Sequence, residues 1–88
     1  MENKVVEVML PDGSMSMFVG ALVSRSETSI VLTSAAWIAH TGRRHLFFAG
    51  KPDASCQVEP YPDGVKIELP GGQVIVTDWP YELFRNPR

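Results

Sequence analysis

The stretch VVEVMLPDGSMSMFVGALVSRSETSIVLTSAAWI, residues 5–38, decides the fold of this 88-residue chain. It contains three apolar runs, separated by tight polar turns at Pro11–Gly13 and Ser24–Thr28. The second run, Ser14–Val23, alternates at first and then becomes apolar on both faces, which is typical of a strand that enters a closed barrel. Gly20 lies in this run, where the missing Cβ allows a bend. The stretch therefore predicts three consecutive antiparallel strands of a small, strongly bent barrel.

The end of the chain predicts two more strands. Val65–Leu69 alternates between apolar and charged residues, Pro70–Gly72 reads as a turn, and Val74–Val76 is β-branched throughout. We expect these two segments to pair as a hairpin. The predicted fold class is mainly β, a five-stranded antiparallel barrel that forms one domain over residues 1–88, because two domains would each be too small to hold a core.

Between the third and fourth predicted strands lies a segment of mixed signals. Ser34–His40 fits either a short helix, because of its alanines, or a continuation of the third strand. Thr41 is a plausible N-cap for a short helix over residues 42–49, and Gly50 then takes the position after its C-terminus. The prediction is therefore one short helix or extended insertion after the third strand.

A long connection, residues 51–64, follows this insertion and contains Pro52, Pro60 and Pro62. It is long for so small a domain, so we expect it to cross the surface and to pack through Val58 and Tyr61.

The composition excludes several classes of protein. The chain is 44% hydrophobic and 20% charged, with a net charge of −2, and no apolar run is long enough for a transmembrane helix. The N-terminus lacks the features of a secretory signal, and the single Cys56 cannot form an internal disulfide. We therefore expect a cytoplasmic protein without membrane contact. There is no overall excess of lysine and arginine, on which sequence-independent nucleic-acid binding depends.

Candidate ligand-binding residues are those that could contact phosphates or stack on bases. Arginines and histidines in turns and on a short helix can bind phosphate, and exposed aromatic rings can stack on bases. Equally, such basic residues can form a solvated helix face, and such aromatic residues can fill the core of a small domain. The candidates are Arg25, Trp37, His40, Arg43, Arg44 and Tyr61.

No catalytic or metal motif is present in the sequence. His40 and His45 are five residues apart, so they do not share a helix face, and no zinc-binding spacing includes them. Cys56 has no recognisable base near it in the sequence. We therefore predict no catalytic residues, no metal, no cofactor and no enzymatic activity.

An open barrel leaves free strand edges, which tend to pair with other chains. Val74, Ile75 and Val76 form an apolar segment with no charged residue before Asp78, so we expect this segment and Trp79 to contribute to a subunit interface. Repeated head-to-tail pairing would close into a ring. A cyclic homo-oligomer is the expected state, with a dimer as the alternative.

The order of strands resembles the Sm-like barrel of Sm, Lsm and Hfq proteins. The resemblance rests on Val5–Leu10, the turn with Gly13, the stretch Gly20–Val23, a polar turn and then Ile30–Leu32. It covers the first forty residues and implies an Sm-like or SH3-like barrel, ring assembly and RNA binding. The Arg-Gly of the second Sm motif and the Tyr-Lys-His of Hfq are absent.

A second resemblance involves the middle of the chain. AAWIAHTGR, residues 35–43, and VEPYPDG, residues 58–64, resemble strings in a group of short uncharacterised phage and prophage proteins. This resemblance implies a phage or prophage origin and no particular activity.

Two functions remain open at this stage. The first is an Sm-like ring that binds RNA or a small nucleotide through Arg25, Arg43 and the aromatic residues. The second is a non-catalytic phage accessory protein that binds and modulates a host protein. The acidic composition favours the second function, and the order of strands favours the first.

Overall fold

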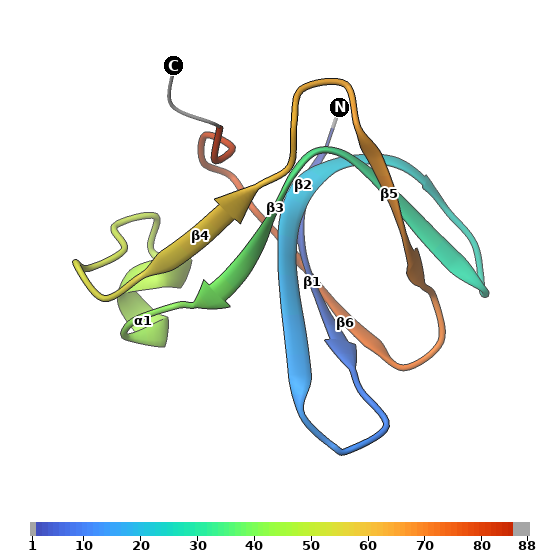
Figure 1. The fold of residues 1–88 in the computed structure, drawn as a ribbon, viewed down its shortest axis with the longest axis horizontal. Helices are drawn as coiled ribbons and strands as arrows, with labels where there is room; N and C mark the ends of the chain where they lie inside the picture. The colour runs from blue at the N-terminus through green and yellow to red at the C-terminus, as the bar shows by residue number, and fades with distance from the viewer. Residues whose placement is uncertain (1, 86–88) are drawn as a thin grey trace.

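A long, bent pair of strands forms the centre of the molecule (Figure 1). The computed structural model describes residues 2–85, and these residues form six strands and one short helix. Residues 1 and 86–88 of the predicted domain lie outside this described part. The elements are β1 (Asn3–Met9), β2 (Met15–Arg25), β3 (Ser29–His40), α1 (Arg44–Phe48), β4 (Gln57–Pro60), β5 (Lys66–Pro70) and β6 (Val74–Asp78).

The strands form one antiparallel sheet in the order β4-β3-β2-β1-β6, and β5 also pairs with β3. The first part of β3 pairs with β5 and its last part pairs with β4, so the two short strands lie along different halves of one long strand (Figure 1). The mainly β, barrel-like prediction is confirmed. Ser34–His40, which fitted either a helix or a strand, continues β3.

The bend lies where β2 and β3 lose their register. Val19 is opposite Ala36, but Ala21 is opposite Thr33, so β3 carries one extra residue, a β-bulge. Ser34 lies in this bulge with a φ of 50°. A Cβ on Gly20 would lie 3.1 Å from the Cβ atoms of Leu32 and Ala35. The strands approach each other closely at this glycine, as the sequence predicts.

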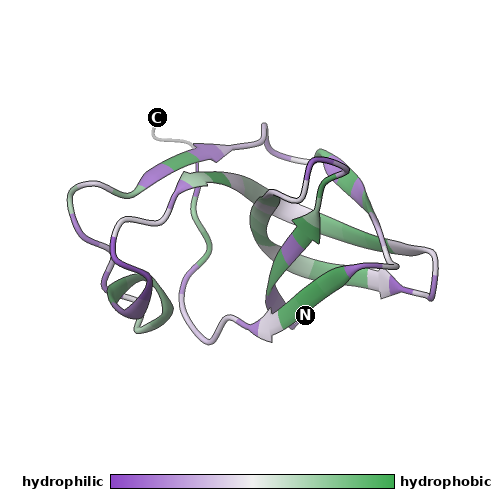
Figure 2. Ribbon diagram, turned by 90° about the horizontal axis from the view of Figure 1, so that it is seen from below, coloured by the Kyte–Doolittle hydropathy of each residue, from purple (hydrophilic) through white to green (hydrophobic). Residues whose placement is uncertain are grey.

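The sheet has an apolar core on each face because its central strands are apolar at successive positions. Val5 belongs to one core and Val6 to the other. Most of the hydrophobic colour in Figure 2 lies on the strands. The buried residues of the first core are Val5, Met17, Val19, Ala36, Ile38, Phe47 and Trp79. Those of the second core are Val6, Val8, Ile30, Leu32, Ala35 and Leu69.

The helix and the chain after β6 cover the first core. The rings of Phe47 and Trp79 lie 4.9 Å apart between centroids, and Phe84 lies 6.2 Å from Phe47. The Trp79 indole N–H donates a hydrogen bond of 3.0 Å to the carbonyl of Glu82. An aromatic cluster therefore joins α1 to the C-terminal segment, which buries more area than so short a helix could bury alone.

The helix differs from its prediction at one end. It begins at Arg44, its N-cap is Arg43, and Thr41 is not the cap. The Thr41 hydroxyl instead donates a hydrogen bond of 2.9 Å to the carbonyl of Gly42, and the N-cap residue makes no side-chain hydrogen bond to the helix. The predicted C-terminus is confirmed, because Gly50 has a φ of 76° and its N–H donates to Phe47 at 3.0 Å.

Two predictions about the second half are wrong. The connection 51–64 contains a strand, β4, so the described sheet has six strands where the sequence predicted five. β5 and β6 also do not pair as a hairpin, because β5 pairs with β3 and β6 pairs with β1. The Gly71 N–H donates a hydrogen bond to the carbonyl of Thr28, which holds the turn after β5 against the β2–β3 turn. From this turn β6 runs away from β5 and pairs with β1. The packing of Val58 and Tyr61 is confirmed.

Candidate functional site

Trp37 and Tyr61 line a shallow hollow of about 260 Å³ beside β4. Trp37 projects from β3, opposite Phe18 on β2 and Glu59 on β4. Tyr61 follows β4, and its backbone N–H donates a hydrogen bond of 2.9 Å to Ala35. The remaining lining residues are Glu59, Pro60 and Pro62.

Trp37 is the unusual residue of this hollow because it is 41% exposed, whereas its neighbours Ala36 and Ile38 are buried. Large rings exposed beside other apolar groups commonly mark sites of contact with another molecule. The two prolines beside it have fixed backbone φ angles, so this wall loses little entropy when a ligand binds. Glu59 is the only charged residue among the lining side chains, so the hollow disfavours anions.

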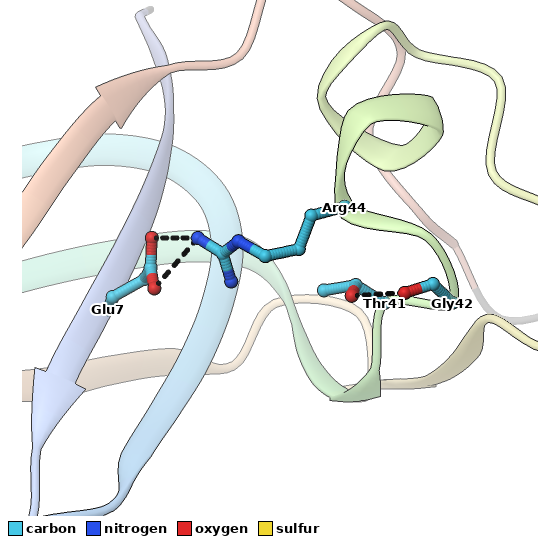
Figure 3. A network of polar contacts seen from close by, with 4 residues as sticks. All are labelled: Glu7, Thr41, Gly42 and Arg44. Atoms are coloured by element: carbon cyan, nitrogen blue, oxygen red, sulfur yellow. Dashed lines mark hydrogen bonds and ion pairs between the residues drawn. The ribbon is translucent and has the colours of Figure 1, made fainter.

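Arg44 contacts the protein itself. Its Nη2 donates to both carboxylate oxygens of Glu7, at 3.0 and 3.2 Å (Figure 3). Its guanidinium also lies 5.1 Å from the centre of the Phe48 ring. Glu7 is buried on β1, so Arg44 neutralises a carboxylate that would otherwise lack a partner. This ion pair gives the predicted ligand-binding residue a structural role.

His40 and Arg43 shape the loop between β3 and α1. The Nδ1 of His40 accepts a hydrogen bond of 2.9 Å from the Gly42 N–H. The Arg43 N–H donates a hydrogen bond of 3.3 Å to the carboxylate of Asp53. Both His40 and Arg43 are exposed. His40 and Arg43 thus belong to the same loop. Neither of them lines the hollow of Trp37 and Tyr61, which we call the aromatic hollow.

Arg25 lies in another part of the molecule. It ends β2 and lines a separate hollow with Ser26, Glu27, Gly71 and Gly72. The β2–β3 turn and α1 occupy opposite ends of the fold (Figure 1). Two of the six candidate ligand-binding residues, Trp37 and Tyr61, share this hollow, and none of the four basic candidates is among its lining residues.

The candidate interface residues divide between surface and core. Val74 and Val76 are half-buried and pack on the second core, and Ile75 is 56% exposed. Trp79 is only 3% exposed in the single chain, so its indole has almost no surface to offer a second subunit.

A larger hollow of about 1030 Å³ lies between the β2–β3 bend and the segment after β6. Its lining mixes hydroxyl groups with one carboxylate and one guanidinium, so it has no consistent chemical character. The lining residues are Asn3, Ala21, Thr33, Ser34, Pro80, Tyr81, Glu82, Leu83 and Arg85.

Asp53 organises the loop near Cys56. Its carboxylate accepts hydrogen bonds from the Ser55 hydroxyl at 2.6 Å and from the Ser55 N–H at 3.0 Å. These bonds, with that from Arg43, hold the pKa of Asp53 below its ordinary value. Partial burial, and then the nearby Asp53 carboxylate, raise the pKa of the Cys56 thiol, which makes it a weaker nucleophile.

Within residues 2–85, no three histidine, cysteine, aspartate or glutamate side chains lie close enough to hold a metal ion. The described part of the chain also has no helix with the length and apolar character to cross a membrane.

Sequence reasoning missed the residues that complete the hollow and the partner of Arg44. The sequence predicted a connection without a strand for the segment that contains Glu59, Pro60 and Pro62. A weak strand signal was present there, because Val58 turns inward and Glu59 turns outward in β4. Glu7 interrupts an otherwise apolar strand, which was the available signal for a buried charge. No protein family, curated protein or solved structure matches the chain.

Proposed function

We propose that this chain is a non-catalytic protein-binding module whose aromatic hollow holds an extended segment of another protein. The observation that carries the proposal is the exposed Trp37 beside Tyr61, in a hollow walled by Pro60 and Pro62. Aromatic rings that are exposed on a rigid sheet supply contact area at a low entropic cost. The setting we propose is the cytoplasm, with a host protein as the partner if the chain comes from a phage.

The chemistry of the hollow suits a proline-containing segment that carries a basic residue. Proline-rich segments are already extended when free, and they dock on exposed aromatic rings in several classes of binding domain. The Glu59 carboxylate at the wall of the hollow would pair with a lysine or arginine of that segment.

RNA or nucleotide binding by an Sm-like ring stays a prediction with less support. Arg44 is engaged with Glu7, Arg25 lies at the other end of the fold, and Glu59 would repel a phosphate near Trp37. A base could still stack on Trp37, so nucleic acid belongs among the probes.

Indole N–H resonances provide the test, because the chain has two tryptophans in different surroundings. We would titrate the ¹⁵N-labelled protein with a proline-rich peptide that contains arginine, with its glutamate counterpart, and with oligouridine. The proposal expects the arginine peptide to shift the Trp37 indole signal and to leave the buried Trp79 signal in place. Trp37→Ala should abolish binding, and Val23→Ala, which removes exposed apolar surface on β2 outside the hollow, should retain it.

A shift of Trp37 with oligouridine alone would transfer support to the RNA-binding function. No shift of Trp37 with any of the three probes would overturn the assignment of this hollow as a binding site for such ligands.

A further inference from the structure

The described sheet has three strands with a free side, β4, β5 and β6. In an antiparallel pair, alternate residues point their N–H and C=O groups toward the partner strand, and the residues between them point these groups outward. The hydrogen bonds at the ends of each strand therefore show which backbone groups each free edge presents.

A proline occupies the last outward position of β4 and the last outward position of β5. On β4, the Tyr61 N–H donates to Ala35, so Tyr61 and Glu59 face β3 and Pro60 faces outward. On β5, the Gly71 N–H donates to Thr28, so Leu69 faces β3 and Pro70 faces outward. Because proline has no N–H, each of these edges lacks a donor that an added strand would need.

The edge of β6 is different. The Met9 N–H donates to Gln73 and the Trp79 N–H donates to Asn3, at 3.2 and 2.9 Å. In this register, Ile75 and Thr77 also face β1. The residues that face outward are Val74, Val76 and Asp78, and none of them is a proline.

The outward groups of β6 are available for pairing. The Val74 N–H donates to the Gly72 carbonyl at 3.1 Å. The N–H groups of Val76 and Asp78, and the outward carbonyls, have no hydrogen-bond partner within residues 2–85. Unpaired groups of this kind are a template for another strand.

Apolar side chains accompany this open edge. Ile75 is 56% exposed and lies opposite Glu7, and the exposed Met9 and Met15 follow on the same face of β1 and β2. These exposed apolar side chains lie near the edge, on the face that also carries Glu7, and their burial would stabilise an added strand.

We propose that two copies of this chain pair antiparallel through β6, with the two-fold axis at Val76. In this register each Val76 N–H donates to the Val76 carbonyl of the second copy, and each Asp78 N–H donates to the Val74 carbonyl. Ile75 lies opposite Thr77 and diagonal to Ile75 of the second copy, within reach across the strands. The two Asp78 side chains, each already paired with Lys4 of its own chain, lie at opposite ends of the paired strands.

The prolines favour a two-fold pair over a head-to-tail ring. A ring would require β6 of one copy to add to β4 or β5 of the next, where Pro60 or Pro70 removes a donor. A two-fold pair uses the same open edge twice and closes on itself. It also uses none of the residues that line the aromatic hollow, because no lining residue belongs to β6.

The first experiment is the mass of the native protein in solution, measured by light scattering over a broad dilution series. We expect twice the 9.7 kDa of one chain at high concentration. Ile75→Lys should weaken the dimer at least tenfold, because it places two ammonium groups diagonally across the pair. Val23→Lys is the matched control, because Val23 is 41% exposed on β2, away from the edge, and this variant should remain dimeric.

The second experiment tests the register in a Cys56→Ser background. Val76→Cys should form a disulfide-linked dimer under mild oxidation, because directly opposite Cα atoms in a bonded antiparallel pair are about 5.5 Å apart, within disulfide range. Gln57→Cys on β4 should not. A monomer at every concentration, a ring mass, or cross-linking through Gln57→Cys alone would overturn the proposal.

Discussion

Arg44 on α1 donates two hydrogen bonds, of 3.0 and 3.2 Å, to the carboxylate of Glu7 on β1. The Glu7 side chain is 9% exposed and that of Arg44 is 58% exposed, so the helix supplies the charge that a buried carboxylate in the sheet requires. The contact joins residues 37 positions apart in the sequence and fixes α1 against the sheet beside the first core.

We expect Arg44→Met to lower the free energy of unfolding by about 1–3 kcal/mol, because it leaves a buried carboxylate without its partner. Glu7→Gln should cost less, since it removes the buried charge as well as the ion pair. The double variant should recover part of the loss. Urea denaturation of the four proteins measures these effects, and wild-type stability in Arg44→Met would show that the pair contributes little.

The two tryptophans should differ sharply when each is replaced by alanine. Trp79→Ala empties the centre of the aromatic cluster with Phe47 and Phe84, and should cost about 3–5 kcal/mol. Trp37→Ala removes a ring from the surface and should change stability by less than about 1 kcal/mol. Thermal denaturation followed by far-ultraviolet circular dichroism compares the stabilities of the two variants. Equal losses would contradict the assignment of Trp37 to the surface.

Stability should fall in acid partly through Asp53. The Ser55 hydroxyl, followed by the Arg43 N–H, holds its pKa below the ordinary 3.8 in the folded state. The unfolded chain therefore takes up the proton first as the pH falls, so the stabilisation is complete above that ordinary value and disappears as the pH falls through the lower folded value. Urea midpoints measured from neutral to acidic pH should show this loss.

Asp53→Asn is the matching variant, and it should be less stable at neutral pH and lose less stability in acid. Part of the loss of stability in acid that remains in this variant should come from Asp12, whose pKa is also lowered, chiefly by the hydrogen bond from the Ser14 hydroxyl. An acid dependence identical to that of the wild type would contradict the role of Asp53.

The Cys56 thiol should react slowly with a thiol reagent. Its pKa is raised by burial and by the Asp53 carboxylate, so a smaller fraction is thiolate at neutral pH than in the unfolded chain. Reaction with a chromogenic disulfide should be slower in the native protein than in urea, and Asp53→Asn should accelerate the native reaction. Equal rates in the native and unfolded protein would show that the thiol is neither buried nor repelled.

The sequence alone determined the features that depend on neighbouring residues. Short apolar runs with partial alternation, and the turn at Asp12–Gly13, predicted the first three strands, because the strand period and the turn geometry are local properties. The bend at Gly20 and the helix end at Gly50 followed from the absence of a side chain at each position.

Only the tertiary structure decided which distant groups meet. β5 and β6 each had the pattern of a strand, but alternation does not name a partner, and their partners turned out to be β3 and β1. Arg44 had the same sequence context as Arg43, yet only Arg44 reaches a buried carboxylate. The outward positions of Pro60 and Pro70 likewise depend on pairing register, a long-range property that burial of both sheet faces selects.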